Sequence, residues 1–146
     1  MKAQHMAGHL IRRLHQVSTQ VFAAQTQTAG FKLTPVQFAA MDAIQSNPGV
    51  DQARVAALIA YDRATIGGVI DRLEKKGLVA RAVSPRDRRS REVRLTTEGE
   101  QVFNALLSVV QALQSDILAG LSKAEKEQFL ALAAKALGPT DSEKTS

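Results

Sequence analysis

The chain has 146 residues, a length that fits one domain or one domain with a helical appendage. It carries 19 lysines and arginines against 14 acidic residues, and the resulting net charge of +5 favours a polyanionic partner. It has no cysteine, which excludes disulfides, cysteine-ligated zinc, a thiolate nucleophile and a thiol redox sensor. No apolar run approaches the roughly 20 residues that span a bilayer, and His5, His9, Arg12 and Arg13 interrupt any N-terminal signal segment, so we expect a cytoplasmic protein.

The first predicted element is a long amphipathic helix from about Met6 to Ala29, ending near Gly30. Its apolar residues recur at helical spacing; they are Leu10, Ile11, Leu14, Val17, Val21 and Phe22. This stripe is longer than a small domain can cover. We therefore expect part of it to pack on another subunit.

A second helix is predicted to begin at Pro35. Thr34 is its expected N-cap, proline suits the first turn because its missing N–H costs nothing there, and Gln37 completes a capping box. The residues predicted to face inward are Phe38, Met41 and Ile44.

Two further helices follow with only a short turn between them. The first starts behind an Asp51 N-cap, and its expected buried residues are Val55, Leu58 and Ile59. The second lies between an Asp62 N-cap and a Gly77 C-cap. The turn is too short for a comfortable antiparallel pair, so the pattern predicts a helix-turn-helix with a steep crossing.

The second of these helices has a narrow apolar stripe. Ile66, Ile70 and Leu73 recur at helical spacing and are predicted to face inward. The residues then expected to lie away from the core are Arg63, Thr65, Gly68, Val69, Asp71, Arg72 and Lys75.

After Gly77 the hydrophobic period changes to two, which predicts two short strands over residues 78–83 and 92–95. Ser84 and Pro85 end the first strand, and residues 86–91 form the loop. Residues 81–94 include six arginines (81, 86, 88, 89, 91 and 94) and two acidic residues, Asp87 and Glu92, which gives an excess of four positive charges. A solvated charge run is the alternative; the arginine content and the position after a helix-turn-helix favour contact with phosphates and a minor groove.

The C-terminal part is again helical. Thr96 or Thr97 is expected to cap a long helix, whose apolar residues are Val102, Phe103, Leu106, Leu107, Val110, Leu113, Ile117 and Leu118. Ser122 and Glu125 form a capping box for a last helix, whose apolar residues are Phe129, Leu130, Leu132, Ala133 and Leu137. The polar tail after Gly138 is predicted to be disordered.

The run from Val55 to Gly99 resembles the MarR family of bacterial winged-helix regulators. The matching segments are TIGGVIDRLEKKGLVAR, residues 65–81, and PRDRRSREVRLTTEG, residues 85–99. The second is the more specific, because it combines an Asp-x-Arg wing with a Leu-Thr-x-x-Gly return into a helix. The likeness extends over nearly the whole chain apart from the C-terminal tail.

The expected fold is mainly α with a small β-hairpin wing, a winged helix-turn-helix with a helical dimerisation region built from both termini. Residues 1–30 and 97–138 would form the dimerisation region, residues 31–96 the DNA-binding domain, and residues 139–146 the disordered tail. Burying both apolar ends in a two-fold dimer would place the reading helices about 34–36 Å apart, in successive major grooves of a pseudo-palindromic operator.

Roles on double-stranded DNA follow from residue type and position. Arg63 and Thr65 are placed for base edges, whereas Arg72 and Lys75 suit phosphates. Gly68 departs from the long polar side chain found in several family members, which leaves close backbone approach and weaker direct readout as alternatives.

The wing supplies the other predicted DNA contacts. By the resemblance, Arg89 is the minor-groove arginine and Asp87 the acid that orients it through a charge-assisted contact. Arg86, Arg88 and Arg91 are expected to neutralise flanking phosphates, so DNA affinity should fall steeply with salt.

The resemblance also implies a small anionic aromatic effector, a carboxylic acid or phenol, bound between the dimerising helices and the winged part. The candidate ligand-binding residues are His9, Arg12, Arg13, His15, Phe38 and Met41. Dimer salt bridges and ordinary surface positions are the alternatives for the N-terminal residues. His5 and His9 lie one helical turn apart, but no third metal ligand is evident nearby, so no metal site is assigned.

The predicted function is that of a homodimeric, sequence-specific repressor released from its operator by such a ligand. No cofactor and no catalytic residues are assigned, because no serine, histidine or acid pair has a catalytic setting. The alternatives are an architectural DNA-binding protein without a ligand and a winged helix used for protein contact.

Overall fold

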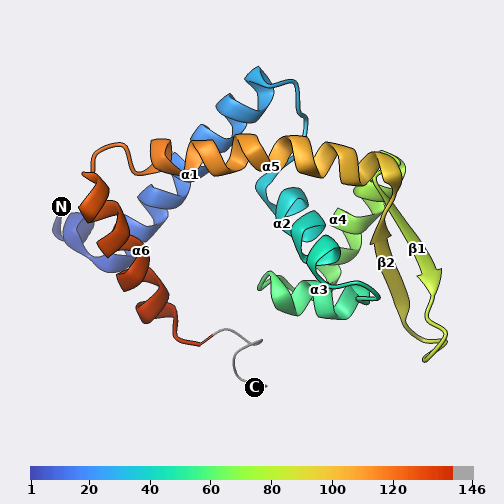
Figure 1. Ribbon diagram of the computed structural model, residues 1–146. Coiled ribbons are helices and arrows are strands. Elements are labelled where there is room, and N and C mark those ends of the chain that lie inside the picture. Colours follow the sequence, from blue (N-terminus) through green and yellow to red (C-terminus); the bar gives the residue numbers. More distant parts are fainter. Residues whose placement is uncertain (140–146) are drawn as a thin grey trace. The chain divides into compact units, whose positions relative to one another are not determined.

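The computed structural model describes residues 1–139 of the chain (Figure 1). Its elements, in order, are η1 (Lys2–His5), α1 (Ala7–Thr28), α2 (Pro35–Ser46), α3 (Gln52–Leu58), α4 (Arg63–Lys75), β1 (Val79–Val83), β2 (Arg91–Leu95), α5 (Thr97–Ile117) and α6 (Lys123–Leu137). The predicted fold class, mainly α with a β-hairpin wing, is confirmed. Apart from Pro139, the tail predicted to be disordered lies outside the described residues.

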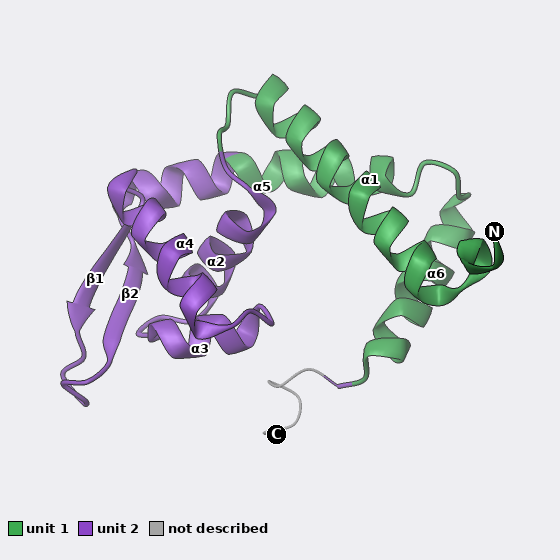
Figure 2. Ribbon diagram, turned by 180° about the vertical axis from the view of Figure 1, so that it is seen from behind, with its two compact units in different colours: residues 1–32, 106–138 green, residues 33–105, 139–146 purple. Residues whose placement is uncertain are grey.

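The chain forms two compact units (Figure 2). Unit 1 comprises residues 1–32 and 106–138, and unit 2 comprises residues 33–105 together with Pro139. Helix α5 contributes residues to both. Unit 2 holds the helix-turn-helix and the wing, and unit 1 holds helices from both termini.

Local capping fixes where the helices begin, as predicted. In α2, the Thr34 hydroxyl accepts from the backbone N–H of Gln37 at 3.2 Å, while the Gln37 side chain accepts from Thr34 N–H at 3.0 Å. Ser122 and Glu125 make the same reciprocal pair at the start of α6, at 3.2 and 2.9 Å. Each box satisfies two of the donors that a helix start leaves free.

Helix α4 ends in a full Schellman motif. Gly77 has φ +76°, a left-handed conformation that glycine adopts without a Cβ penalty. The N–H of Leu78 donates to the Leu73 carbonyl at 3.1 Å, and that of Gly77 to the Glu74 carbonyl at 2.9 Å. Leu73 and Leu78 are both buried, which adds the apolar contact usual for this motif.

The wing is an antiparallel hairpin in which Val79 pairs with Leu95, Arg81 with Val93, and Val83 with Arg91. A short extended segment before α3 lies along β2, because Val93 N–H donates to the Val50 carbonyl at 2.9 Å and Asp51 bridges to Glu92. The hairpin is therefore anchored at its base to the start of α3, while residues 84–90 form its free end (Figure 1).

The core of unit 2 is formed where α2, α3, α4 and the base of the hairpin meet. Its most fully buried residues are Ala40, Met41, Val55, Ile66, Ile70, Leu73, Val93 and Phe103. Phe38 is half-buried and stacks on Phe103 with ring centroids 5.4 Å apart. The prediction that Val69 faces outward is wrong, because Val69 is only 3% exposed. It follows Ile66 by three residues, so the buried stripe of α4 is wider than the three residues chosen from the sequence.

Unit 1 buries a smaller core of Phe22 and Thr26 from α1 with Leu106, Val110 and Leu113 from α5. The Thr26 hydroxyl donates to the Phe22 carbonyl at 2.7 Å, which satisfies it inside the apolar contact. Large apolar residues elsewhere in this unit stay exposed; they are Leu10, Ile11, Leu14, Leu130, Leu132 and Leu137. Across residues 1–139, none of the helices has both the length and the apolar character needed to cross a bilayer.

Gly99 allows the closest backbone approach in unit 2. A Cβ at this position would lie 2.0 Å from the carbonyl oxygen of Leu78. Thr96 completes the junction: its N–H donates to the same carbonyl at 3.0 Å, and its hydroxyl donates to the Gly77 carbonyl at 2.6 Å while accepting from Gly99 N–H at 3.0 Å. Thr96, rather than Thr97, therefore caps α5.

Replacing Gly99 with alanine should lower the free energy of unfolding by about 3 kcal/mol, because the Leu78 backbone must move to admit the methyl group. Chemical denaturation followed by circular dichroism measures this. Gly120→Ala is the matched control, since a Cβ there meets nothing within 4 Å. Equal stability of the two variants would contradict the close contact.

Candidate nucleic-acid interface

The N-terminal turn of α4 presents the residues predicted to contact bases. Asp62 caps the helix: its carboxylate accepts from Thr65 N–H at 2.8 Å and from the Thr65 hydroxyl at 2.8 Å. These two hydrogen bonds, the backbone one first, lower the pKa of Asp62 below its usual value. The carboxylate is therefore charged at neutral pH, where it also complements the positive end of the helix dipole.

The same contacts define what Thr65 can offer to a base. Its hydroxyl proton is already donated to Asp62, so the exposed side chain keeps an accepting oxygen and a methyl group. Such a methyl group can make an apolar contact with the methyl group of thymine in the major groove. Arg63 is exposed beside it and has no side-chain partner within the described part of the chain.

The remaining DNA-contact candidates on α4 lie along the same helix. Arg72 and Lys75 are exposed in its last turn, and Gly68 is half-buried. A Cβ at Gly68 would meet only the flexible end of the Arg72 side chain, 3.9 Å away. The fold therefore does not require glycine at position 68, and close backbone approach and weaker direct readout both stay predictions.

The free end of the wing is ordered by short polar contacts. The Ser84 hydroxyl, which is buried, accepts from the N–H groups of Arg86 at 3.2 Å and Asp87 at 3.4 Å. Ser84 N–H donates to the Ser90 carbonyl, and Ser90 N–H to the Asp87 carbonyl, both at 3.0 Å. The loop backbone is thus held in a defined turn.

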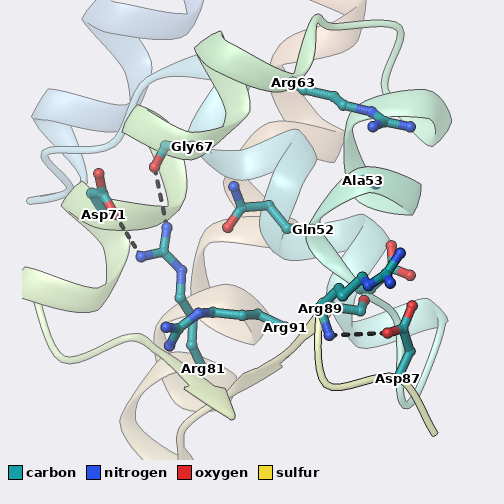
Figure 3. A pocket seen from close by; sticks show the side chains of 11 residues that line it. Gln52, Ala53, Arg63, Gly67, Asp71, Arg81, Asp87, Arg89 and Arg91 are labelled. Atoms are coloured by element: carbon teal, nitrogen blue, oxygen red, sulfur yellow. Dashed lines mark hydrogen bonds and ion pairs between the residues drawn. The ribbon is translucent and has the colours of Figure 1, made fainter. Parts of the chain in front are cut away.

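Asp87 orients Arg89 through the backbone. Its carboxylate accepts from the N–H of Arg89 at 2.9 Å, an Asx-turn contact, and within residues 1–139 it forms no ion pair with the Arg89 guanidinium (Figure 3). The predicted pairing of these two residues is present, but the charge-assisted contact between their side chains is not. The guanidinium remains free for another anion.

The wing arginines differ from one another in their surroundings. Arg86, Arg88, Arg89 and Arg91 are exposed, and none of their side chains makes an ion pair in the described part of the chain. Arg81 is different: its side chain is 15% exposed and lies 2.6 Å from the Asp71 carboxylate. Arg81 was counted in the local charge excess but was not among the predicted DNA contacts, and its charge is matched inside the protein.

Some of these residues line a cleft of about 610 Å³ between α3, α4 and the wing (Figure 3). Its lining includes Arg63 from the start of α4, and Arg89 and Arg91 from the wing. Asp51, Asp71 and Asp87 also line it, but each accepts a hydrogen bond from a protein group. Cationic side chains that form no ion pair with the described part of the chain therefore border the cleft on two sides.

The predicted ligand-binding residues fall in both units. His9, Arg12, Arg13 and His15 lie on α1 in unit 1, where the Arg13 guanidinium donates to the Gln16 side chain at 3.0 Å. Phe38 and Met41 lie on α2 in unit 2, and Met41 is completely buried in the core. Whether the two groups form one pocket therefore stays a prediction.

His15 also lines a separate groove of about 590 Å³ within unit 1. Its walls are apolar, with Leu14, Ile117 and Phe129 among them, and Lys126 donates to the Ser115 hydroxyl at 3.0 Å at its polar side. Sequence reasoning did not single out this groove, because it depends on how α1, α5 and α6 pack. Among residues 1–139, no group of three or more His, Cys, Asp or Glu side chains could hold a metal ion.

Comparison with known proteins gives consistent matches. A sequence profile described as MarR family matches residues 31–90. The transcriptional regulator HosA of Escherichia coli O111:H- is 34% identical over 135 residues, covering 92% of this chain and 97% of HosA.

Two solved structures extend this likeness. The structure of Bordetella bronchiseptica BpsR, which concerns regulation of its DNA binding by 6-hydroxynicotinic acid, has a TM-score of 0.85 at 29% identity, covering 93% of this chain and 96% of that one. The transcriptional repressor CouR, bound to a 23-mer DNA duplex, has a TM-score of 0.84 at 26% identity, covering 93% and 95%.

The Asp62 cap predicts a defined pH dependence. Because folding lowers this pKa, the charged cap stabilises the fold above the unfolded-state value and is lost as the pH falls below about 4. Asp62→Asn keeps an accepting oxygen but does not titrate. The melting temperature of the wild type should therefore exceed that of the variant at pH 6, with the difference shrinking toward pH 3; a difference independent of pH would contradict this role.

Proposed function

The chain belongs to the MarR family of DNA-binding transcriptional regulators, and from this we propose that it acts as a homodimeric repressor released from a pseudo-palindromic operator by a small aromatic acid or phenol. The members of this family to which it is similar are regulators and not enzymes. The DNA-binding part rests on unit 2, and the dimer and the effector rest on unit 1 and on the relatives.

The observation that carries the DNA-binding role is the pairing of two basic surfaces within one unit. The capped start of α4 exposes Arg63 and Thr65, and the wing exposes four arginines that form no ion pair within residues 1–139. A helix of this kind fits a major groove, and an arginine-tipped loop fits an adjacent minor groove. CouR, which has a similar fold, is a repressor solved on a DNA duplex.

Exposed apolar residues support the dimer. Ile11 is 65% exposed on α1, and Leu132 and Leu137 are 66% and 87% exposed on α6. Large apolar side chains gathered on the terminal helices of one unit are typical of an interaction surface. A two-fold dimer would cover them and would present two reading helices to successive major grooves, about 34–36 Å apart.

The effector class is supported by a relative and by residue chemistry. The DNA binding of BpsR is regulated by 6-hydroxynicotinic acid, which is a hydroxylated aromatic carboxylic acid. In the present chain Arg12 is exposed on α1, and its guanidinium can pair with a carboxylate or phenolate. A ligand of this kind shifts DNA binding only if it prefers one spacing of the reading helices over another.

Arg89→Ala should weaken binding to the operator by about 10- to 100-fold, because it removes the proposed minor-groove contact from both half-sites. Gel-shift titration of a duplex selected from a randomised pool measures the loss. Lys135→Ala, which removes one exposed positive charge from α6, is the control for net charge and should retain full affinity. Unchanged affinity of the Arg89 variant would contradict the role of the wing.

An aromatic carboxylate should release the protein from this duplex. Titration with benzoates, hydroxycinnamates and pyridine carboxylates should identify at least one compound that lowers DNA affinity tenfold or more, and the Arg12→Gln, Arg13→Gln double variant should lose the response. Calorimetry without DNA separates binding from release. Failure of every compound to bind would contradict the effector class while leaving the DNA-binding role intact.

A further inference from the structure

Arg81 connects the wing to the reading helix through a set of contacts that we call the Arg81 clamp, made of Arg81, Asp71 and Gly67. Its Nη1 lies 2.6 Å from the Asp71 carboxylate, and its Nη2 donates to the Gly67 carbonyl at 3.2 Å (Figure 3). The Glu74 carboxylate lies 3.9 Å from Nη1. One guanidinium thus contacts two successive turns of α4.

The two ends of the clamp lie at functionally distinct places. Gly67 and Asp71 are in the middle of α4, between the turn that exposes Arg63 and the turn that exposes Arg72. The backbone of Arg81 lies in β1, where it pairs with the buried Val93 of β2. The side chain therefore spans from the hairpin that carries the wing arginines to the helix that carries the base-reading residues.

The burial of Arg81 is poorly suited to a purely stabilising role. Its side chain is 15% exposed, and its Nε is buried with no hydrogen-bond partner in the described part of the chain. Taking a guanidinium out of water costs free energy that its ion pairs offset only in part. A planar group held by two acceptors is, however, well suited to fixing one element relative to another.

We propose that Arg81 is a positioning residue for sequence discrimination, which sets the separation between the wing arginines and the base-reading turn of α4. The inference rests on the proposed DNA-binding function. It adds a role for Arg81, which is not among the residues proposed to contact DNA. Phosphate contacts tolerate a shift of the wing because every step of the duplex presents them, whereas base contacts require a fixed distance. Loss of the clamp should therefore reduce specific binding more than non-specific binding.

The test compares Arg81→Met with Arg94→Met. Methionine keeps an apolar side chain of similar length but makes no ion pair, and Arg94 is an exposed arginine of the same hairpin, so both variants lose one positive charge. Fluorescence anisotropy gives the affinity for the selected duplex and for a scrambled duplex of equal length. The ratio of the two affinities should fall about tenfold in Arg81→Met and stay near the wild-type value in Arg94→Met.

A second pair of variants separates position from charge. Arg81→Met leaves the Asp71 carboxylate unmatched, and this negative charge alone would weaken both kinds of binding. The Arg81→Met, Asp71→Asn double variant removes it. If Arg81 positions the wing, overall affinity recovers in the double variant while the ratio stays low; recovery of the ratio to the wild-type value would overturn the proposal.

The Asp71→Asn single variant keeps the test valid if Arg81→Met does not fold. Asp71 is 59% exposed, so its replacement should leave the fold intact. The loss of a negative charge should raise scrambled-duplex affinity, while the weakened clamp prevents an equal rise for the selected duplex. Equal rises would overturn the clamp. A wild type that does not discriminate between the duplexes would overturn the proposed function, and the clamp with it.

Discussion

Unit 2 depends on a close backbone contact between the end of α4 and the start of α5. Leu78 ends the Schellman motif of α4 and leads into the hairpin. Its carbonyl accepts a hydrogen bond from the Thr96 N–H, and the α-carbon of Gly99 packs closely against the same carbonyl. The start of β1 and the end of β2 are therefore joined at the Leu78 carbonyl. The base of the hairpin cannot move without opening the helix cap, so the wing has a fixed origin beside α4.

Charge is distributed over this frame in two ways. Arg81 is held inside the unit through its side chain, by Asp71 and the Gly67 carbonyl, while Arg86 and Arg89 of the wing loop are held through their backbone N–H groups, by Ser84 and Asp87. In the proposed function the first kind of arginine fixes geometry and the second kind binds DNA phosphates. Phosphates that bind the second kind release counterions, which makes affinity sensitive to salt, whereas the internal pair is screened far less.

Much of the fold could be predicted because it is encoded locally. The caps at Thr34, Asp62, Gly77 and Ser122 each need only a few neighbouring residues, and all are present.

The outward assignment of Val69 failed because the width of a buried stripe depends on how many elements pack against the helix. The charge of Arg81 could not be assigned from its place in an arginine-rich run, since its partners lie 10 and 14 residues away on α4. The glycine of the Leu-Thr-x-x-Gly motif was recognised by resemblance, and its physical reason, the Leu78 carbonyl, depends on the folded chain. The effector residues could not be resolved further, because they are divided between two units.

Hydroxyl-radical footprinting of the wild-type protein on its selected duplex tests most directly whether one unit presents a reading helix and a wing together. If α4 lies in a major groove and the wing in the adjacent minor groove, each half-site will show protection at both of these neighbouring grooves, and the two half-sites will be centred about one helical turn apart. Uniform protection along the duplex, or protection confined to a single groove, would contradict this arrangement.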